Sequence, residues 1–236
     1  MVCAVKWLKL FVAILLLPAC GALTLATWDT VRALLPTATE KTSLAFLIGY
    51  GLWLVVFVAL PKPTRTYVLG HELTHAFWAL LMGARVGGLK VGKTGGQVQT
   101  SKTNWFITLA PYFFPFYAML FIALFFAAHL IWNLTPWFWV LFLLVGLGWS
   151  FHVTFTLMLL FSVAQPDLKS QGYLFSAVII YLMNLLTMLV TATALSPALH
   201  FADLGTAIWQ SSLLSYGWTL DKLFALWQHV VHAVRH

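Results

Sequence analysis

Long apolar runs decide the fold class of this chain. Residues 10–27, 44–60, 137–163 and 173–195 are apolar stretches of about the length that a helix needs to cross a bilayer. Inside lipid the backbone must satisfy its own N–H and C=O groups, which leaves only helices or closed barrels as spanning structures. Only 8% of the residues are charged and the mean hydropathy is +0.90, which excludes an ordinary soluble domain. We therefore expect an all-α polytopic membrane protein.

The apolar pattern predicts about six transmembrane helices, at residues 10–27, 44–60, 66–82, 105–131, 137–163 and 173–195. The first run reads either as a signal-peptide core or as an uncleaved helix, and we favour the helix. A polar connection is expected at 29–43. Pro111 and Pro115 should interrupt the fourth helix near its start, and the glycines at 146–148 should weaken the fifth.

The domain organisation follows from the same pattern. We assign residues 1–198 to a single membrane domain with its core at 66–195. In residues 199–236, Trp, Leu and Val recur among polar side chains at helical spacing, which predicts an amphipathic C-terminal helix on the surface of the bilayer. The net charge of +7 is spread over short connections. Such a distribution suits contact with lipid headgroups, and we expect no nucleic-acid partner.

A glycine-rich segment at residues 83–104 differs from its apolar surroundings. On both sides of Gly95-Gly96, apolar and polar residues alternate, which is typical of a short β-hairpin with its turn at the glycines. A flexible basic loop remains the alternative. The segment carries Arg85, Lys90, Lys93 and Lys102, which the positive-inside rule would place on the cytoplasmic face.

The sequence His71-Glu72-Leu73-Thr74-His75 lies inside the third predicted helix. Residues four apart share one face of a helix, so the two imidazoles can bind one Zn²⁺, with Glu72 beside them as a proton acceptor. With 8 His and two Glu in the chain, random placement predicts about 0.002 occurrences of this motif. The alternative is a structural remnant in which the histidines are merely satisfied polar groups.

On these residues the chain resembles the site-2 protease family of intramembrane zinc metalloproteases, the M50 peptidases, and in particular their M50B-like branch. The resemblance covers residues 66–185 and includes the glycine-rich segment and Leu109-Ala110-Pro111. It implies that Asp167 is the third zinc ligand. His152 is the competing candidate. About 22 Å of straight helix separates it from Asp167, so the two cannot share one metal.

The resemblance implies a multi-pass protein of a bacterial cytoplasmic membrane that hydrolyses peptide bonds of transmembrane protein substrates. Zn²⁺ would be held by His71, His75 and Asp167, and Glu72 would be the general base. Two alternatives stay open, namely an inactive relative that acts as a membrane scaffold or chaperone, and a metal carrier that uses the same ligands. The substrate and the oligomeric state are not readable from the sequence.

Overall fold

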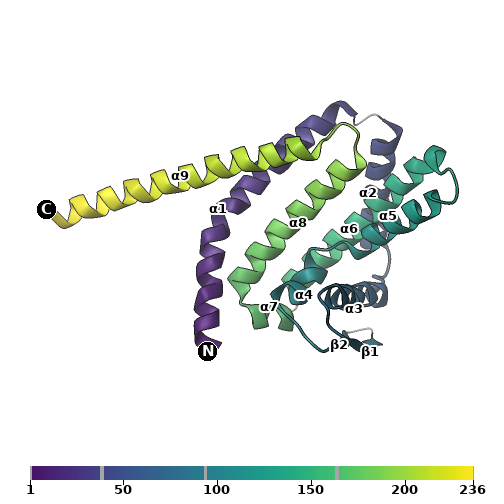
Figure 1. The fold of residues 1–236 in the computed structure, drawn as a ribbon, viewed down its shortest axis with the longest axis horizontal. Coiled ribbons are helices and arrows are strands. Elements are labelled where there is room, and N and C mark those ends of the chain that lie inside the picture. The colour runs from purple at the N-terminus through teal and green to yellow at the C-terminus, as the bar shows by residue number, and fades with distance from the viewer. Residues whose placement is uncertain (1, 38–39, 93–94, 163–164, 236) are drawn as a thin grey trace. The chain divides into compact units, whose positions relative to one another are not determined.

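The computed structural model describes residues 2–37, 40–92, 95–162 and 165–235, and most of them are helical (Figure 1). The chain divides into two compact units. One unit combines Met1–Pro36 with Gly172–His236, and the other is Thr37–Gln171. Each unit is described by itself below.

The first unit consists of helices α1 (Val2–Leu34), α8 (Tyr173–Leu195) and α9 (Phe201–Arg235). Thr24 of α1 shares a hydrogen bond of 2.7 Å with the Tyr181 hydroxyl of α8, and the hydroxyl of Tyr216 in α9 donates to the Leu15 carbonyl of α1 at 2.9 Å. The predicted helix at 173–195 is confirmed. The polar connection expected from residue 29 is wrong at its start, because α1 continues to Leu34.

Helix α9 has the amphipathic pattern that the sequence predicts. Its apolar residues include Trp209, Leu213, Leu220 and Trp227, which are spaced by four or seven residues and therefore share one face. All four are exposed. The helix is 35 residues long, yet it is not among the helices that are apolar enough to cross a membrane.

In the second unit, α2 (Lys41–Ala59) packs along α6 (Phe138–Ser162). Glycines allow the close approach. A Cβ at Gly49 would lie 2.0 Å from the Leu143 carbonyl oxygen, and a Cβ at Gly146 would lie 2.1 Å from the Phe46 carbonyl oxygen. Helix α6 is continuous through residues 146–148, where the sequence predicts a weak point. These glycines are sites of helix packing, as is common between membrane helices.

The fourth predicted helix is broken, as its prolines suggest. It consists of α4 (Trp105–Leu109), the 3₁₀ turn η2 (Ala110–Tyr112) and α5 (Phe116–His129), and the two halves are bent by 86°. Pro111 lies within η2, and Pro115 immediately precedes α5. The 3₁₀ turn η3 (Thr135–Trp137) then returns the chain to α6, which packs against α5.

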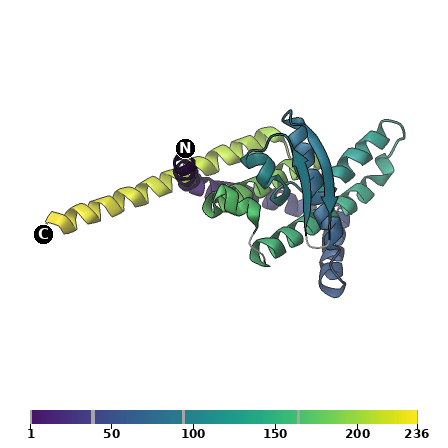
Figure 2. The same ribbon diagram turned by 90° about the horizontal axis from the view of Figure 1, so that it is seen from below.

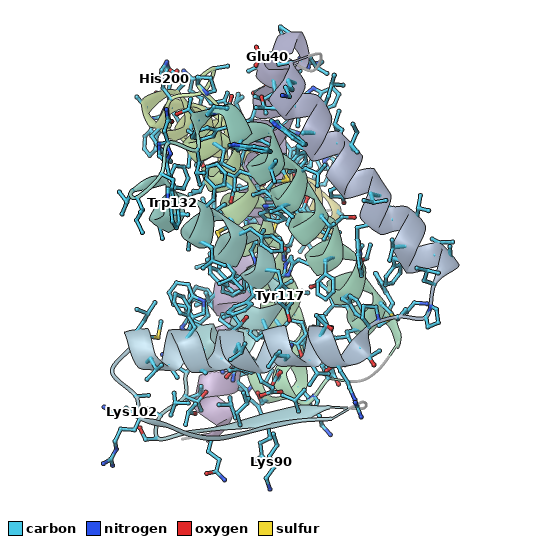
Figure 3. The ribbon with its side chains drawn as sticks, turned by 90° about the vertical axis from the view of Figure 1, so that its right-hand side faces the viewer. Glu40, Lys90, Lys102, Tyr117, Trp132 and His200 are labelled. Carbon is cyan, nitrogen blue, oxygen red and sulfur yellow. The ribbon has the colours of Figure 1, made fainter. Side chains whose placement is uncertain are left out.

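Helix α3 (Thr64–Leu81) carries the motif and lies between the hairpin and the longer helices of its unit (Figure 3). Two residues after its last residue, Leu81, the chain turns at Gly83, whose φ of 72° is the left-handed conformation that glycine adopts without strain. The Gly83 N–H bonds to the Leu80 carbonyl and the Ala84 N–H to the Ala79 carbonyl, which satisfies the last carbonyls of the helix.

The predicted β-hairpin is confirmed. Strands β1 (Val86–Val91) and β2 (Gly96–Thr100) pair antiparallel, with Leu89 opposite Val98, and run alongside α3 (Figure 2). The expected turn at Gly95-Gly96 is wrong at its second glycine, because Gly96 begins β2 and pairs with Val91, while residues 93–94 lie outside the described residues. The side chains of Lys90 and Lys102 point away from α3 (Figure 3).

Within the described residues, four helices are long and apolar enough to cross a membrane: Val5–Leu34, Lys41–Ala59, Thr135–Phe161 and Tyr173–Leu195. A fifth is added if the bent pair of α4–η2 and α5 forms one span. Helix α3 is not among them. The mostly helical, membrane-type architecture is thus confirmed, while the number six stays a prediction.

Candidate metal centre

Three potential metal ligands converge in the second unit. His71 and His75 lie one turn apart on α3, with ring centroids 4.9 Å apart. Asp167 lies in the first turn of the short helix α7 (Pro166–Gln171). Its Oδ2 is 3.6 Å from Nε2 of His71 and 3.8 Å from Nε2 of His75. The ligand atoms of all three residues lie within 4.8 Å of one another.

This donor set could hold a metal ion, and its ligand types are ones that zinc accepts. Two imidazoles and one carboxylate form a common ligand set of catalytic zinc sites, in which the fourth position is left to water. Bonds of about 2.0–2.2 Å in a tetrahedral site place neighbouring ligand atoms about 3.4 Å apart. The distances from Asp167 to the two imidazoles exceed that value by only a few tenths of an ångström. Because the three ligand atoms lie within 4.8 Å of one another, side-chain shifts on the order of 1 Å would close the site around a metal.

Each imidazole is oriented through its other nitrogen. His75 Nδ1 lies 2.8 Å from the Ile107 carbonyl oxygen, which fixes its proton on Nδ1 and leaves the Nε2 lone pair free. Asn104 caps α4 by accepting from the Ile107 N–H at 2.9 Å, and so holds this carbonyl in place. His71 Nδ1 lies 3.2 Å from the Tyr67 hydroxyl, one turn earlier on α3.

Asp167 is held by a tyrosine. The hydroxyl of Tyr112, the last residue of η2, donates to Asp167 Oδ2 at 3.0 Å. The Tyr112 ring also packs edge-on against His71, with centroids 5.2 Å apart. The break between α4 and α5 thus brings a second chain segment to the metal ligands.

Glu72 is buried beside the hairpin, with 7% of its surface exposed. A Cβ at Gly96 of β2 would lie 2.6 Å from Glu72 Cγ and 2.9 Å from its Oε1. The backbone N–H of Val98, on the same strand, also lies near the Glu72 carboxylate. The side chain of Glu72 therefore lies between α3 and strand β2.

The electrostatics of the cluster favour metal binding at neutral pH. The hydrogen bond between His75 Nδ1 and the Ile107 carbonyl leaves the Nε2 lone pair available to a metal. Burial opposes ionisation of Asp167, but the imidazoles of His71 and His75 and the Tyr112 hydroxyl outweigh it and lower the pKa of that carboxyl.

A small cavity of about 20 Å³ adjoins the cluster. Its lining includes His71 and Thr74 of α3, Tyr117 of α5 and His152 of α6. The volume is enough for about one water molecule. His152 is therefore near the cluster, but it is not one of the three converging ligands.

The three residues expected to bind the metal are thus brought together by the fold, and the geometry favours Asp167 over His152 as the third. Sequence reasoning missed the residues that orient them. Tyr67 could have been found, because it lies four residues before His71 on the same helix face. Tyr112 and the Ile107 carbonyl could not, since their contacts with the ligands depend on tertiary structure.

Comparisons of the chain with protein-family models, with curated proteins and with solved structures gave no match. The functional argument therefore depends on the site itself.

Proposed function

We propose that this protein is a zinc metallopeptidase of membranes, similar to the site-2 proteases, that hydrolyses peptide bonds of membrane-embedded proteins. The observation that supports this most is the convergence of His71, His75 and Asp167, with Glu72 buried next to the first ligand. A structural remnant would need neither a complete ligand set nor a glutamate beside it.

The chemistry would be divided between the metal and the chain. Bound by His71, His75 and Asp167, Zn²⁺ would lower the pKa of water and polarise the scissile carbonyl. Glu72 would accept the proton of the attacking water and deliver it to the leaving amine. Its position next to His71 and its burial support this role, because a general base must lie within reach of the water that it deprotonates.

The hairpin gives a route for holding the substrate. A helical peptide bond is masked by its own hydrogen bonds, so a transmembrane substrate must be extended before it is cleaved. Strand β2 pairs with β1 on one edge, while its Val98 N–H lies near Glu72. An extended segment added to this edge of β2 would lie next to the cluster. Pro111 and Pro115, at the break between α4 and α5, would let the neighbouring helix move aside.

The test uses the full-length protein purified in detergent, with Glu72→Gln, His75→Ala and Asp167→Ala. Metal content is measured by mass spectrometry. Hydrolysis is measured on fluorescent casein and on a reconstituted single-span Leu/Ala peptide with a central Gly-Ser pair. We expect one zinc per chain in the wild type and in Glu72→Gln, but much less in the two ligand variants. Removal of the general base should lower the hydrolysis rate by about 10²–10⁴.

Three results would contradict the proposal or one of its assignments. Zinc retained in both His75→Ala and Asp167→Ala would remove the site assignment. A zinc-loaded wild type that cleaves neither probe would favour a scaffold, or a carrier if zinc crosses the membrane of proteoliposomes. Full hydrolysis by Glu72→Gln would remove the assigned general base.

A further inference from the structure

Tyr112 is buried among the metal ligands although no sequence motif points to it. It is 0% exposed and ends the 3₁₀ turn η2 directly after Pro111. Pro111 restricts the backbone torsion at this turn, so the turn between α4 and α5 holds Tyr112 in a fixed position. Its hydroxyl donates to Asp167 at 3.0 Å.

The hydrogen bond falls on one particular oxygen of Asp167. Oδ2 accepts from Tyr112, and the same Oδ2 lies 3.6 Å from His71 Nε2 and 3.8 Å from His75 Nε2. A carboxylate oxygen has two lone pairs. With one of them directed to the phenol, the other remains for a metal between the imidazoles.

Two further contacts restrict the tyrosine. Its ring packs edge-on against His71, so it touches two of the three ligands. Its hydroxyl also lies 3.3 Å from Gln165 Oε1, just ahead of α7. A phenol has one proton to donate, and the shorter distance and the negative charge favour Asp167 as its acceptor.

We propose that Tyr112 is a positioning residue that keeps Asp167 on the metal through Oδ2 alone. Coordination by one oxygen leaves the fourth position of the site for water. Without the hydroxyl, the carboxylate is free to turn and bind through both oxygens, or to leave the metal. This inference rests on the proposed zinc site but does not require that the protein be a peptidase.

The test compares Tyr112→Phe with the wild type as full chains in detergent. Phenylalanine keeps the ring against His71 and removes only the hydroxyl. Zinc affinity is measured by competition with a chelator, and we expect it to fall by about 10–100-fold, as is usual when a partner of a ligand is lost. The site is also loaded with Co²⁺, whose visible bands weaken when a four-coordinate site becomes five-coordinate. We expect weaker bands in Tyr112→Phe.

Tyr117→Phe is the matched control. The Tyr117 hydroxyl donates to the Thr66 carbonyl of α3 at 2.6 Å. This phenol therefore bonds to the motif helix, but to none of the three ligands. We expect zinc affinity and Co²⁺ bands like those of the wild type. The thermal transition of each metal-free variant reports whether its fold is kept.

The outcomes separate this inference from the peptidase proposal. Wild-type affinity and Co²⁺ bands in Tyr112→Phe would overturn it, and so would an equal loss of affinity in Tyr117→Phe. A selective loss in Tyr112→Phe supports it, even if no variant hydrolyses a peptide bond. A wild type that binds no zinc would overturn both.

Discussion

Replacement of Gly49 by alanine should destabilise the second unit strongly. The new Cβ would lie 2.0 Å from the Leu143 carbonyl oxygen of α6. A normal contact between these atoms is about 3.2 Å, so α2 and α6 must separate by about 1 Å. A gap of that size loses up to about half of the dispersion energy of each contact between the two helices. Overpacking against a backbone atom, which cannot rotate away, should reach the upper end of its usual range, about 3 kcal/mol.

Gly51 offers a control in the same helix. A Cβ at Gly51 would meet no atom within 4 Å. Alanine there should stabilise α2 by about 0.5–1 kcal/mol, because glycine is the more flexible residue in the unfolded chain. The two variants should therefore differ by about 4 kcal/mol, or nearly 1000-fold in the unfolding equilibrium. Equilibrium unfolding by SDS in mixed micelles measures this difference. Equal unfolding midpoints for Gly49→Ala and Gly51→Ala would refute the packing argument.

Three other substitutions test the surroundings of the site. Asn104→Ala removes the cap of α4, which should cost about 1 kcal/mol in thermal unfolding. It should also weaken zinc binding in a chelator titration, because the Ile107 carbonyl loses its support; unchanged zinc affinity would count against this link. Gly83→Ala imposes a left-handed conformation on alanine and should cost about 1–2 kcal/mol, whereas Gly88→Ala, which meets open space, should not. Gly96→Ala should displace Glu72 and lower hydrolysis at least about tenfold while zinc stays bound; loss of zinc would contradict it.

Elements with a strong local signal were predictable from the sequence. The helix at 173–195 has the predicted bounds, and the strands Val86–Val91 and Gly96–Thr100 pair as the alternation suggests. The break at Pro111 and Pro115 is also present, because proline removes a helical hydrogen bond whatever the tertiary context. The four-residue spacing of His71 and His75 was enough to place both imidazoles on one face.

Features that depend on contacts between distant segments were not predictable. Glycines in a single helix read as weak points, and only the position of α2 shows that Gly146 is a packing site. Asp167 was assigned through a resemblance, since spacing along the chain cannot bring α7 to α3. The Tyr112 hydroxyl lies in the turn between α4 and α5, which are bent by 86°. Its hydrogen bond to Asp167 could be recognised only from this tertiary arrangement.

The same bend has a consequence for biosynthesis. Helix α5 has 14 residues, which correspond to about 21 Å, whereas the hydrocarbon core is about 30 Å thick. Such a segment is too short to be retained in the bilayer as an independent span. Its C-terminal end packs against the next helix, because the rings of Phe125 and Phe126 contact Phe138 at the start of α6. If synthesis stops before α6 has left the ribosome, α5 therefore lacks the neighbouring helix that stabilises it.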